Sequence, residues 1–226
     1  MLKKIVIAID GPAASGKSTT AKLTAEKLNY LHIDTGAMYR ALTLKVIENN
    51  VNPEDETSVY DTVKNCVIEF DRNKNAMLVF LDGKNVTEAI RNREVTRNVS
   101  AVSSYKKVRQ LMVNEQRRLS EGGGVVLEGR DIGTVVVPNA DLKIFMVASV
   151  EERVKRRQKE LAEKGTNVDY DKLVKDIIDR DTKDSKRTES PLRKADDAII
   201  LDTSNLTINQ QVDFIVDKAL EIINSK

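Results

Sequence analysis

The chain has 226 residues, of which 40% are hydrophobic and 32% are charged, so it is long enough for one large domain, or for a core with a modest insertion. Its 37 basic and 35 acidic residues leave a net charge of +2, which excludes a general electrostatic attraction to nucleic acid polymers or anionic membranes. Cys66 is the only cysteine, so neither an intramolecular disulfide nor a multi-cysteine metal site can form, and a reducing cytoplasm is the expected location.

Short apolar runs rich in β-branched residues alternate with longer segments of helical periodicity along most of the chain. The runs predict strands at Lys4–Ile9, Tyr30–Ile33, Val125–Leu127, Leu142–Val147 and Ala198–Leu201. The segments between them predict helices at Ser18–Leu28, Gly36–Ile47 and Lys106–Leu119. This alternation is typical of an α/β fold in which helices cover both faces of a parallel sheet. The first run is too short for a signal-peptide core or a membrane span.

Two regions depart from this alternation. Between residues 64 and 87, two strand-like runs are separated by the polar stretch Asp71–Asn75 and followed by Asp82-Gly83, a pair that favours a hairpin turn. We therefore expect a small antiparallel sheet here, and we expect Cys66 to be a buried reduced thiol. Residues 151–193 predict two polar helices with little apolar surface, which is typical of a solvated or mobile flap.

Two capping boxes mark where helices begin. Ser149-Val-Glu-Glu152 is expected to open a charged helix that ends near Gly165, and Thr207-Ile-Asn-Gln210 is expected to open the last helix. The apolar positions of the last helix predict a buried face made of Val212, Ile215, Val216, Ala219 and Leu220.

The stretch GPAASGKS, which begins at Gly11, matches the phosphate-loop pattern G-x-x-x-x-G-K-[ST], follows a predicted strand and opens a predicted helix. In such a loop, backbone N–H groups hold phosphate oxygens, Lys17 reaches the β- and γ-phosphates, and the Ser18 hydroxyl is a Mg²⁺ ligand. The alternative interpretation is a plain turn before a helix. The predicted nucleotide-binding residues are Gly11, Pro12, Ala13, Ala14, Ser15, Gly16, Lys17, Ser18 and Thr19.

The stretch DTGAMYR, which begins at Asp34, stands at the end of the second predicted strand. In an open α/β sheet that position faces the same crevice as the phosphate loop. Thr35 is a candidate helix cap, and Arg40 lies about one turn into the helix. The alternative interpretation is a cap, a glycine turn and a surface arginine.

The third stretch, Val125–Thr134, runs from an apolar strand into a glycine-containing loop. Glu128 ends the strand, and Arg130 and Asp131 follow it. These two residues either face a ligand in the crevice or form a local salt bridge with each other.

The fourth stretch lies in the charged flap, where spacings of four and then three residues place Arg180, Asp184 and Arg187 on one helical face. Such a face is usually solvated. Together with Arg109 and a cluster at Arg91, Arg93 and Arg97, however, it makes arginine recur in every segment that borders the predicted crevice.

This recurrence of arginine favours one kind of phosphoryl acceptor. A hydroxyl acceptor benefits from a carboxylate base, whereas a phosphate monoester is already mostly dianionic at pH 7 because its second pKa is about 6. A monoester therefore needs guanidinium groups that screen one phosphate from another, and it needs no base. His32, the only histidine, lies in the second predicted strand and is expected to be a core or strand-end residue.

The four stretches together resemble the bacterial cytidylate kinases, in the family's order and spacing and nearly end to end. They read GPAASGKS, DTGAMYR, EGRDIGT with VVVPNADLKIF, and RDTKDSKR followed by SPL. The resemblance implies a P-loop kinase fold, with a five-stranded parallel sheet flanked by helices, a small antiparallel insertion on the monophosphate side and a helical lid. The implied ranges are 1–60, 99–150 and 191–226 for the core, 61–98 for the insertion and 151–190 for the lid.

The same resemblance implies an activity. The chain is expected to be a phosphotransferase of pyrimidine nucleotide metabolism that moves the γ-phosphoryl group of ATP, with Mg²⁺, to CMP or dCMP, giving ADP and the cytidine diphosphate. Its expected partners are these small nucleotides, without a nucleic acid polymer or a membrane. It is expected to be a cytoplasmic monomer.

Site roles also follow from the resemblance, residue by residue. The implied substrate-binding residues are Thr35, Arg40, Ser100, Arg109, Arg130, Asp131, Arg180, Asp184 and Arg187. The implied catalytic residues are Lys17, Arg130, Asp131, Arg180 and Arg187. The family often has Asp where Glu128 stands, which leaves open whether Glu128 or Asp131 supports the magnesium ion.

Two other functions remain open. One is a P-loop kinase for another small acceptor, either a different nucleoside monophosphate or a hydroxyl such as that of shikimate, for which Asp34 is a candidate base. The other is a nucleotide-binding switch without transfer chemistry. The sequence has no guanine-reading Asn-Lys-x-Asp pattern, which disfavours a GTPase.

Overall fold

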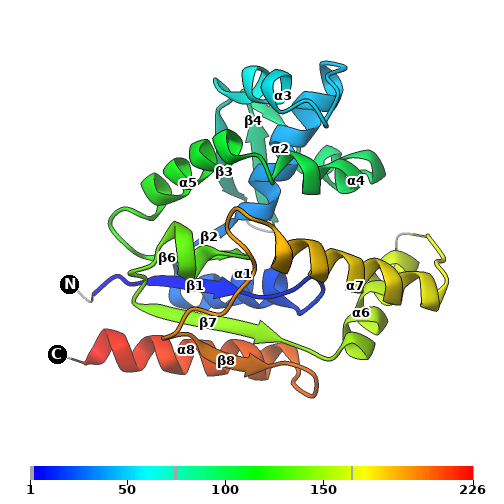
Figure 1. Cartoon of the computed structure of the whole chain (residues 1–226). Coiled ribbons are helices and arrows are strands. Elements are labelled where there is room, and N and C mark those ends of the chain that lie inside the picture. The colour runs from blue at the N-terminus through cyan, green and yellow to red at the C-terminus, as the bar shows by residue number, and fades with distance from the viewer. Residues whose placement is uncertain (1–2, 74–75, 164, 226) are drawn as a thin grey trace. The chain divides into compact units, whose positions relative to one another are not determined.

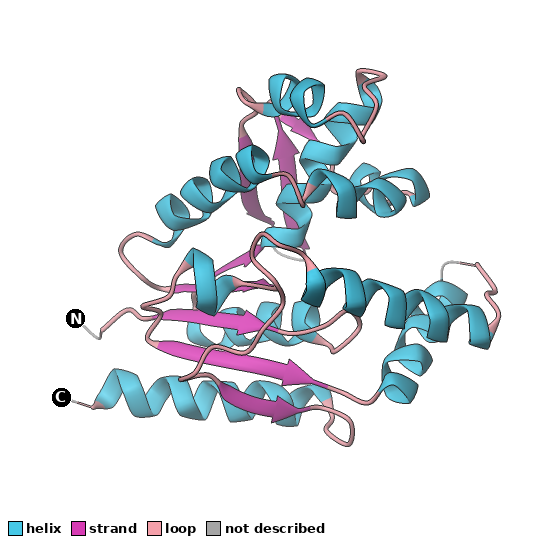
Figure 2. Cartoon of the chain, in the orientation of Figure 1, coloured by secondary structure: helices cyan, strands magenta, loops and turns pink. Residues whose placement is uncertain are grey.

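The computed structural model describes residues 3–73, 76–163 and 165–225. It divides into two compact units, one made of Met1–His32 and Gly122–Lys226 and the other of Ile33–Glu121. Figure 1 labels the helices and strands of both units, and Figure 2 distinguishes them by colour. Within the described residues, no helix combines the length and the hydropathy that crossing a membrane requires.

The larger sheet has five strands in the order β2-β6-β1-β7-β8, and it belongs to the first unit except for Ile33 and Asp34 at the end of β2. Its strands are β1 (Val6–Asp10), β2 (Leu31–Asp34), β6 (Val125–Gly129), β7 (Leu142–Val147) and β8 (Ile199–Asp202). The central strand β1 pairs in parallel with β6 and β7, and β7 pairs in parallel with β8. These pairings confirm the predicted five-stranded parallel sheet.

Burial explains the composition of these strands. Ile7, Ala8 and Ile9 of β1 are all fully buried, as expected for a central parallel strand that has no solvent face. Helices α1 (Lys17–Leu28) and α8 (Ile208–Asn224) contact each other and share one apolar core with β1 and β7. At the edge of the sheet, β8 leaves Ile200 57% exposed.

The two predicted capping boxes have different outcomes. At the start of α8 the box is complete, because the Gln210 N–H donates to Thr207 Oγ1 at 3.3 Å and the Thr207 N–H donates to Gln210 Oε1 at 2.9 Å. At Ser149 only half of the box forms. The Glu152 N–H donates to Ser149 Oγ at 3.2 Å, but the Ser149 N–H donates to Ser204 Oγ at 3.0 Å.

The predicted buried face of α8 is confirmed for Val212, Ile215 and Ala219, whereas Val216 is half-buried. The prediction for Leu220 is wrong, because this side chain is 42% exposed. Leu220 lies one residue beyond Ala219, which turns it about 100° around the helix and away from the core.

Two helices occupy the polar region near residues 151–193, as predicted. They are α6 (Val150–Glu163) and α7 (Tyr170–Lys186), and they contact each other. The expectation of little apolar surface is wrong. Val154, Leu173 and Ile177 are buried in a small core of their own, which is completed by partly buried Val150, Leu161, Val168 and Val174. This core gives the helix pair a packing centre separate from the main sheet.

The second unit contains a three-stranded sheet with the order β3-β4-β5. Its strands are β3 (Ile68–Asn73), β4 (Ala76–Leu81) and β5 (Lys84–Asn85), and both pairings are antiparallel. The helices of this unit are α2 (Thr35–Glu48), α3 (Glu56–Val63), α4 (Arg93–Val102), α5 (Lys106–Ser120) and the short 3₁₀ helix η1 (Ala89–Arg91).

The inserted antiparallel sheet and its tight turn are confirmed. Asp82 and Gly83 connect β4 to β5 with φ angles of 50° and 77°, the left-handed pair that a two-residue hairpin turn requires. The predicted polar loop Asp71–Asn75 is shorter than expected, because β3 continues to Asn73. Its remaining residues, 74 and 75, lie outside the described residues. Cys66 is only half-buried, and burial raises the pKa of its thiol to about 11, which fits an unreactive thiol.

Candidate active site

The predicted phosphate loop connects β1 to α1 in the first unit. Gly11 has a φ of 152°, and a Cβ at this position would lie 2.2 Å from the carbonyl oxygen of Met146 on β7, so only glycine fits. Gly16, with a φ of 93°, is the N-cap of α1. The loop therefore lies close against the sheet at the N-terminus of a helix, where free backbone N–H groups favour anions.

Lys17 begins α1 and folds back over the loop. Its Nζ donates to the carbonyl oxygen of Pro12 at 2.7 Å and to Ser15 Oγ at 3.4 Å. The pKa of this ammonium is lowered to about 7, first by burial and then by the positive charges of Arg130 and Arg180. The charges of two arginines from distant segments of the chain therefore act on the lysine of the phosphate loop.

Ser18, Glu128 and His32 form a hydrogen-bonded chain beside the loop, which runs from the exposed Ser18 to the buried Glu128 and His32. Ser18 Oγ donates to Glu128 Oε2 at 2.7 Å, and His32 Nε2 lies 3.1 Å from Glu128 Oε1. Glu128, at the end of β6, and His32, on β2, are both buried. The hydroxyl that the loop pattern assigns to magnesium is thus in direct contact with the Glu128 carboxylate. His32 is a buried strand residue, as expected.

Asp10 ties the end of β1 to η2 (Ile132–Val136), a short π-helical turn that follows β6. Its carboxylate accepts the backbone N–H groups of Ile132 at 2.8 Å and Gly133 at 2.7 Å. Burial raises the pKa of Asp10 to about 6, although these two N–H groups act to lower it. Asp10 therefore fixes the loop that carries Arg130 and Asp131.

Two ion pairs join this loop to the C-terminal end of α7. Arg130 Nε donates to Asp184 Oδ2 at 2.8 Å, and Arg187 Nη2 lies 3.5 Å from Asp131 Oδ1. Burial alone would raise the pKa of Asp184, but Arg130, Arg180 and Arg187 act against it and lower that pKa below its usual value. Arg130 and Asp131 are thus each paired with a residue far along the chain.

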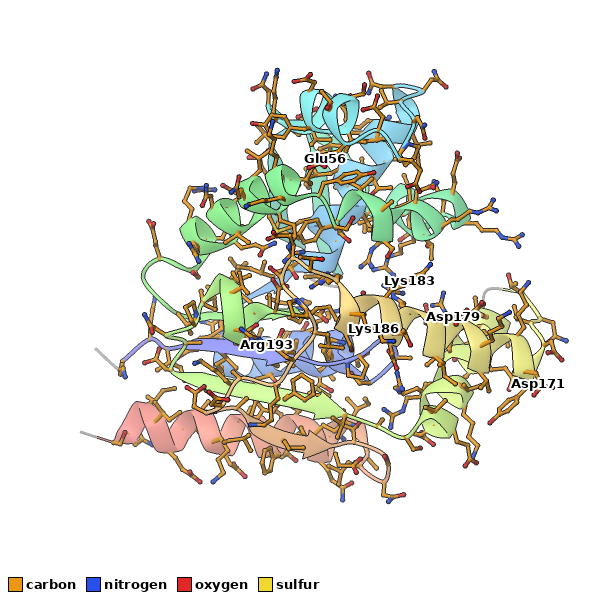
Figure 3. The ribbon with its side chains drawn as sticks, viewed as in Figure 1. Glu56, Asp171, Asp179, Lys183, Lys186 and Arg193 are labelled. Carbon is orange, nitrogen blue, oxygen red and sulfur yellow. The ribbon has the colours of Figure 1, made fainter. Side chains whose placement is uncertain are left out.

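The solvated-face interpretation of this part of α7 is wrong for two of its three residues. Asp184 and Arg187 are mostly buried by these ion pairs, whereas Arg180 is exposed and acts on Lys17 and Asp184 through its charge. The remainder of the helix does carry charged side chains along its length, among them Asp171, Asp179, Lys183 and Lys186 (Figure 3).

Two arginines of α6 hold the phosphate loop, and neither was among the residues predicted from the sequence. Arg153 Nη1 donates to the Ala13 carbonyl oxygen at 3.3 Å and to Asp181 Oδ2 at 2.6 Å. Arg156 Nη1 donates to the Ser15 carbonyl oxygen at 3.2 Å, and its Nη2 donates to the Thr203 carbonyl oxygen at 2.6 Å. The two arginines are three residues apart, so they lie on one face of the helix, and this spacing was the sequence signal for a shared partner.

In the second unit, the start of α2 differs from the prediction. Asp34, not Thr35, is the N-cap, because its Oδ1 accepts the Ala37 N–H at 2.9 Å. Thr35 is the first residue of the helix and is buried. Arg40 Nη2 donates to Asp34 Oδ2 at 3.1 Å, so this arginine is half-buried and not the free surface side chain of the alternative interpretation.

Arg109 lies on α5 and is 4% exposed. Its guanidinium carbon is 5.5 Å from the centre of the Tyr39 ring on α2, and its Nη1 donates to the Ser103 carbonyl oxygen at 3.1 Å. The unit thus brings Arg109 next to the helix that carries Thr35 and Arg40. Ser100, on α4, is exposed.

Comparisons with known proteins identify the family of this chain. A family model described as Cytidylate kinase matches residues 7–224. A cytidylate kinase from Bacillus subtilis (strain 168) is 50% identical over 226 residues, which cover 100% of this chain and 99% of the relative. A cytidylate kinase from Bacillus cereus (strain ATCC 10987 / NRS 248) is 51% identical over 224 residues, covering 99% of this chain and 98% of the relative. The chain therefore belongs to the cytidylate kinase family.

Proposed function

We propose that this chain transfers the γ-phosphoryl group of Mg-ATP to CMP or dCMP and releases ADP and the cytidine diphosphate. The observation that carries the proposal is the phosphate loop Gly11–Ser18 at the N-terminus of α1, over which buried Lys17 folds, with Arg130 and Arg180 close enough for their charges to act on Lys17. Negative charge spreads over the moving phosphoryl group during transfer, and cationic stabilisation is the main catalytic contribution. Membership of the cytidylate kinase family supports the choice of acceptor.

On the donor side, the loop Gly11–Thr19 would hold the ATP phosphates, and Lys17 would follow the transferred group. The Ser18 hydroxyl and the Glu128 carboxylate fit a magnesium ion, since both offer the oxygen ligands that this hard cation prefers. Bound magnesium would neutralise charge on the phosphates. The contact between Ser18 and Glu128 favours Glu128 as the carboxylate that supports the ion, while Asp131 is paired with Arg187.

On the acceptor side, we assign roles from the resemblance and from the contacts of each residue. Thr35 and Arg40 would hold the monophosphate, Arg130 and Asp131 the nucleotide, and Asp184 the sugar hydroxyls. Ser100 and Arg109 would complete the acceptor site. The range 61–98 would serve as the monophosphate-side insertion and 151–190 as the lid. Asp34 already caps α2 and pairs with Arg40, which does not favour it as the base of a hydroxyl kinase.

The direct test follows the phosphoryl group itself. ATP labelled in its γ-phosphate is incubated with the protein, Mg²⁺ and CMP, and the products are separated. Label is expected in CDP, with little released as inorganic phosphate. Consumption of ATP that does not depend on CMP, or binding of ATP without transfer, would instead support the switch interpretation.

The depressed pKa of Lys17 predicts a pH dependence of nucleotide binding. Because the free ammonium loses its proton near pH 7, affinity for metal-free ATP is expected to fall by up to about tenfold per unit of pH above this value. Calorimetric titrations from about pH 7.5 to about pH 9 avoid the titration of the nucleotide itself, whose second phosphate pKa is about 6. The Lys17→Arg variant stays charged and should lose this slope. Equal slopes in the two proteins would contradict the prediction.

We also propose that the chain acts as a monomer in the cytoplasm. Its single half-buried cysteine fits a reducing compartment, and its small net charge gives no general attraction to a membrane surface. Light scattering on the eluate of a size-exclusion column should give the mass of one chain, with and without nucleotides.

A further inference from the structure

The hydrogen-bonded chain Ser18–Glu128–His32 contains one residue with no role in the proposed mechanism. His32 is the only histidine of the protein, and it is buried on β2, the strand next to β6 in the sheet. Its Nε2 lies 3.1 Å from Glu128 Oε1, and the other oxygen of the same carboxylate accepts the Ser18 hydroxyl at 2.7 Å. The two oxygens of Glu128 are therefore engaged by groups from two different elements.

The surroundings of the imidazole select one tautomer. His32 Nδ1 is buried and has no hydrogen-bond partner among the described residues. A neutral imidazole carries one N–H and one lone pair. Placing the N–H on Nδ1 would bury a donor without an acceptor and would turn the Nε2 lone pair toward a carboxylate oxygen. The N–H on Nε2 avoids both problems, so His32 donates to Glu128.

A glutamate side chain has three rotatable torsions, and the last one, which orients the carboxylate plane, is broad. The Nε2–H of His32, which is held by a strand of the sheet, restricts this rotation because it binds the carboxylate oxygen opposite the one that faces Ser18. Outer groups that orient an inner ligand in this way typically change metal affinity or activity by about 10-fold to 100-fold when they are removed.

We infer that His32 is a positioning residue of the phosphate-transfer site: its Nε2–H holds the Glu128 carboxylate so that the opposite oxygen faces Ser18. This inference rests on the proposed function only in assigning Ser18 and Glu128 to the magnesium-nucleotide side of the reaction. The contact itself joins two residues that are 96 positions apart in the sequence.

The first test reads the tautomer directly. Because the chain has a single histidine, a tag-free protein labelled with nitrogen-15 gives one imidazole spectrum. The expected spectrum shows a protonated Nε2 and an unprotonated Nδ1. In the Glu128→Ala variant, the preference for this tautomer is expected to weaken. A wild-type spectrum with the proton on Nδ1 overturns the inference.

The second test separates positioning from general stability. The ratio of affinities for Mg-ADP and metal-free ADP is measured by calorimetry in wild type, His32→Leu and His32→Gln. The His32→Leu variant is expected to lower this ratio about tenfold, with little change in metal-free ADP binding. The His32→Gln variant keeps an N–H donor at the position of Nε2 and should recover most of the loss. An unchanged ratio in His32→Leu overturns the inference.

The matched control is Tyr30→Phe. Tyr30 is buried two residues before His32, and its hydroxyl accepts the Ile5 N–H at 3.2 Å, so the variant also removes one buried hydrogen bond. Its Mg-ADP to ADP ratio should match wild type. If His32→Leu does not fold, the inference is tested by the nitrogen-15 spectrum of the wild-type protein and by the ratio of Mg-ADP to ADP affinities in His32→Gln. A wild-type protein that phosphorylates no nucleotide would refute the proposed function, whereas both tests of His32 would still give a result.

Discussion

Replacing Lys17 by alanine is expected to lower kcat by about a hundredfold or more while the protein stays folded. The ammonium is the buried cation of the phosphate loop, and its contacts are with the loop itself, through the Pro12 carbonyl oxygen and Ser15 Oγ. During transfer it would follow the phosphoryl group, so its loss removes charge stabilisation that water cannot replace. Initial rates of ADP formation with saturating ATP and CMP measure the effect.

The matched control for this variant is Lys22→Ala. Lys22 lies on the same helix, is 40% exposed and forms an i, i+4 ion pair with Glu26 at 4.0 Å. This exposed pair is expected to contribute little, so kcat and the melting temperature should both stay near wild type. A Lys17→Ala protein with a normal circular dichroism spectrum and nearly normal kcat would contradict the catalytic role of Lys17.

Replacing Arg187 by alanine is expected to lower kcat by roughly a hundredfold, with ATP affinity largely retained. The guanidinium sits at the C-terminal end of α7, where it lies 3.5 Å from Asp131 and donates to the Ser190 carbonyl oxygen at 2.5 Å. If Arg187 stabilises charge that develops only during transfer, binding of the ground-state nucleotide loses little. Steady-state kinetics and ATP titrations on the same preparation separate the two effects.

Lys186→Ala provides the control, because this neighbouring cation is exposed at the end of the same helix (Figure 3). Its kcat should remain close to wild type. Near-normal turnover in Arg187→Ala, or an equal loss in both variants, would refute a specific role for Arg187 and leave only a general effect of positive charge.

Features set by neighbouring residues were predictable from the sequence. The capping box of Thr207 and Gln210 closes within one turn, and the Asp82-Gly83 turn depends on the φ angles of two adjacent residues. The phosphate loop belongs to the same class, because its glycines, its lysine and the following helix are contiguous. For such features, local conformational preference and final structure agree.

Features set by distant partners were not predictable. The box at Ser149 is only half formed because Ser204, 55 residues away, accepts the serine N–H. The partner of Arg130 is Asp184, 54 residues away, although Asp131 is its neighbour in sequence. For His32, the sequence predicted only a position in a strand. Its contact with Glu128 depends on which strands are adjacent in the sheet. Which side chains meet across a sheet depends on the order of the strands, and this order cannot be predicted from the individual residues.

The helix pair α6–α7 shows a third kind of limit. Its composition is strongly charged, which led to the expectation of a solvated flap with little apolar surface. A few apolar residues, including Val154, Leu173 and Ile177, are nevertheless spaced so that they meet between the two helices. With that core in place, Arg153 and Arg156 can reach the carbonyl oxygens of the phosphate loop. Average composition could not reveal this arrangement, because it depends on a small number of positions.

The central claim is that cytidine monophosphates are the phosphoryl acceptors. Its most direct test is kcat/KM, from ADP formation with saturating Mg-ATP, for the ribo- and deoxyribo-monophosphates of cytosine, uracil or thymine, adenine and guanine under identical conditions. CMP and dCMP are expected to lead by a wide margin. An equal or larger value for AMP or GMP would contradict the claim.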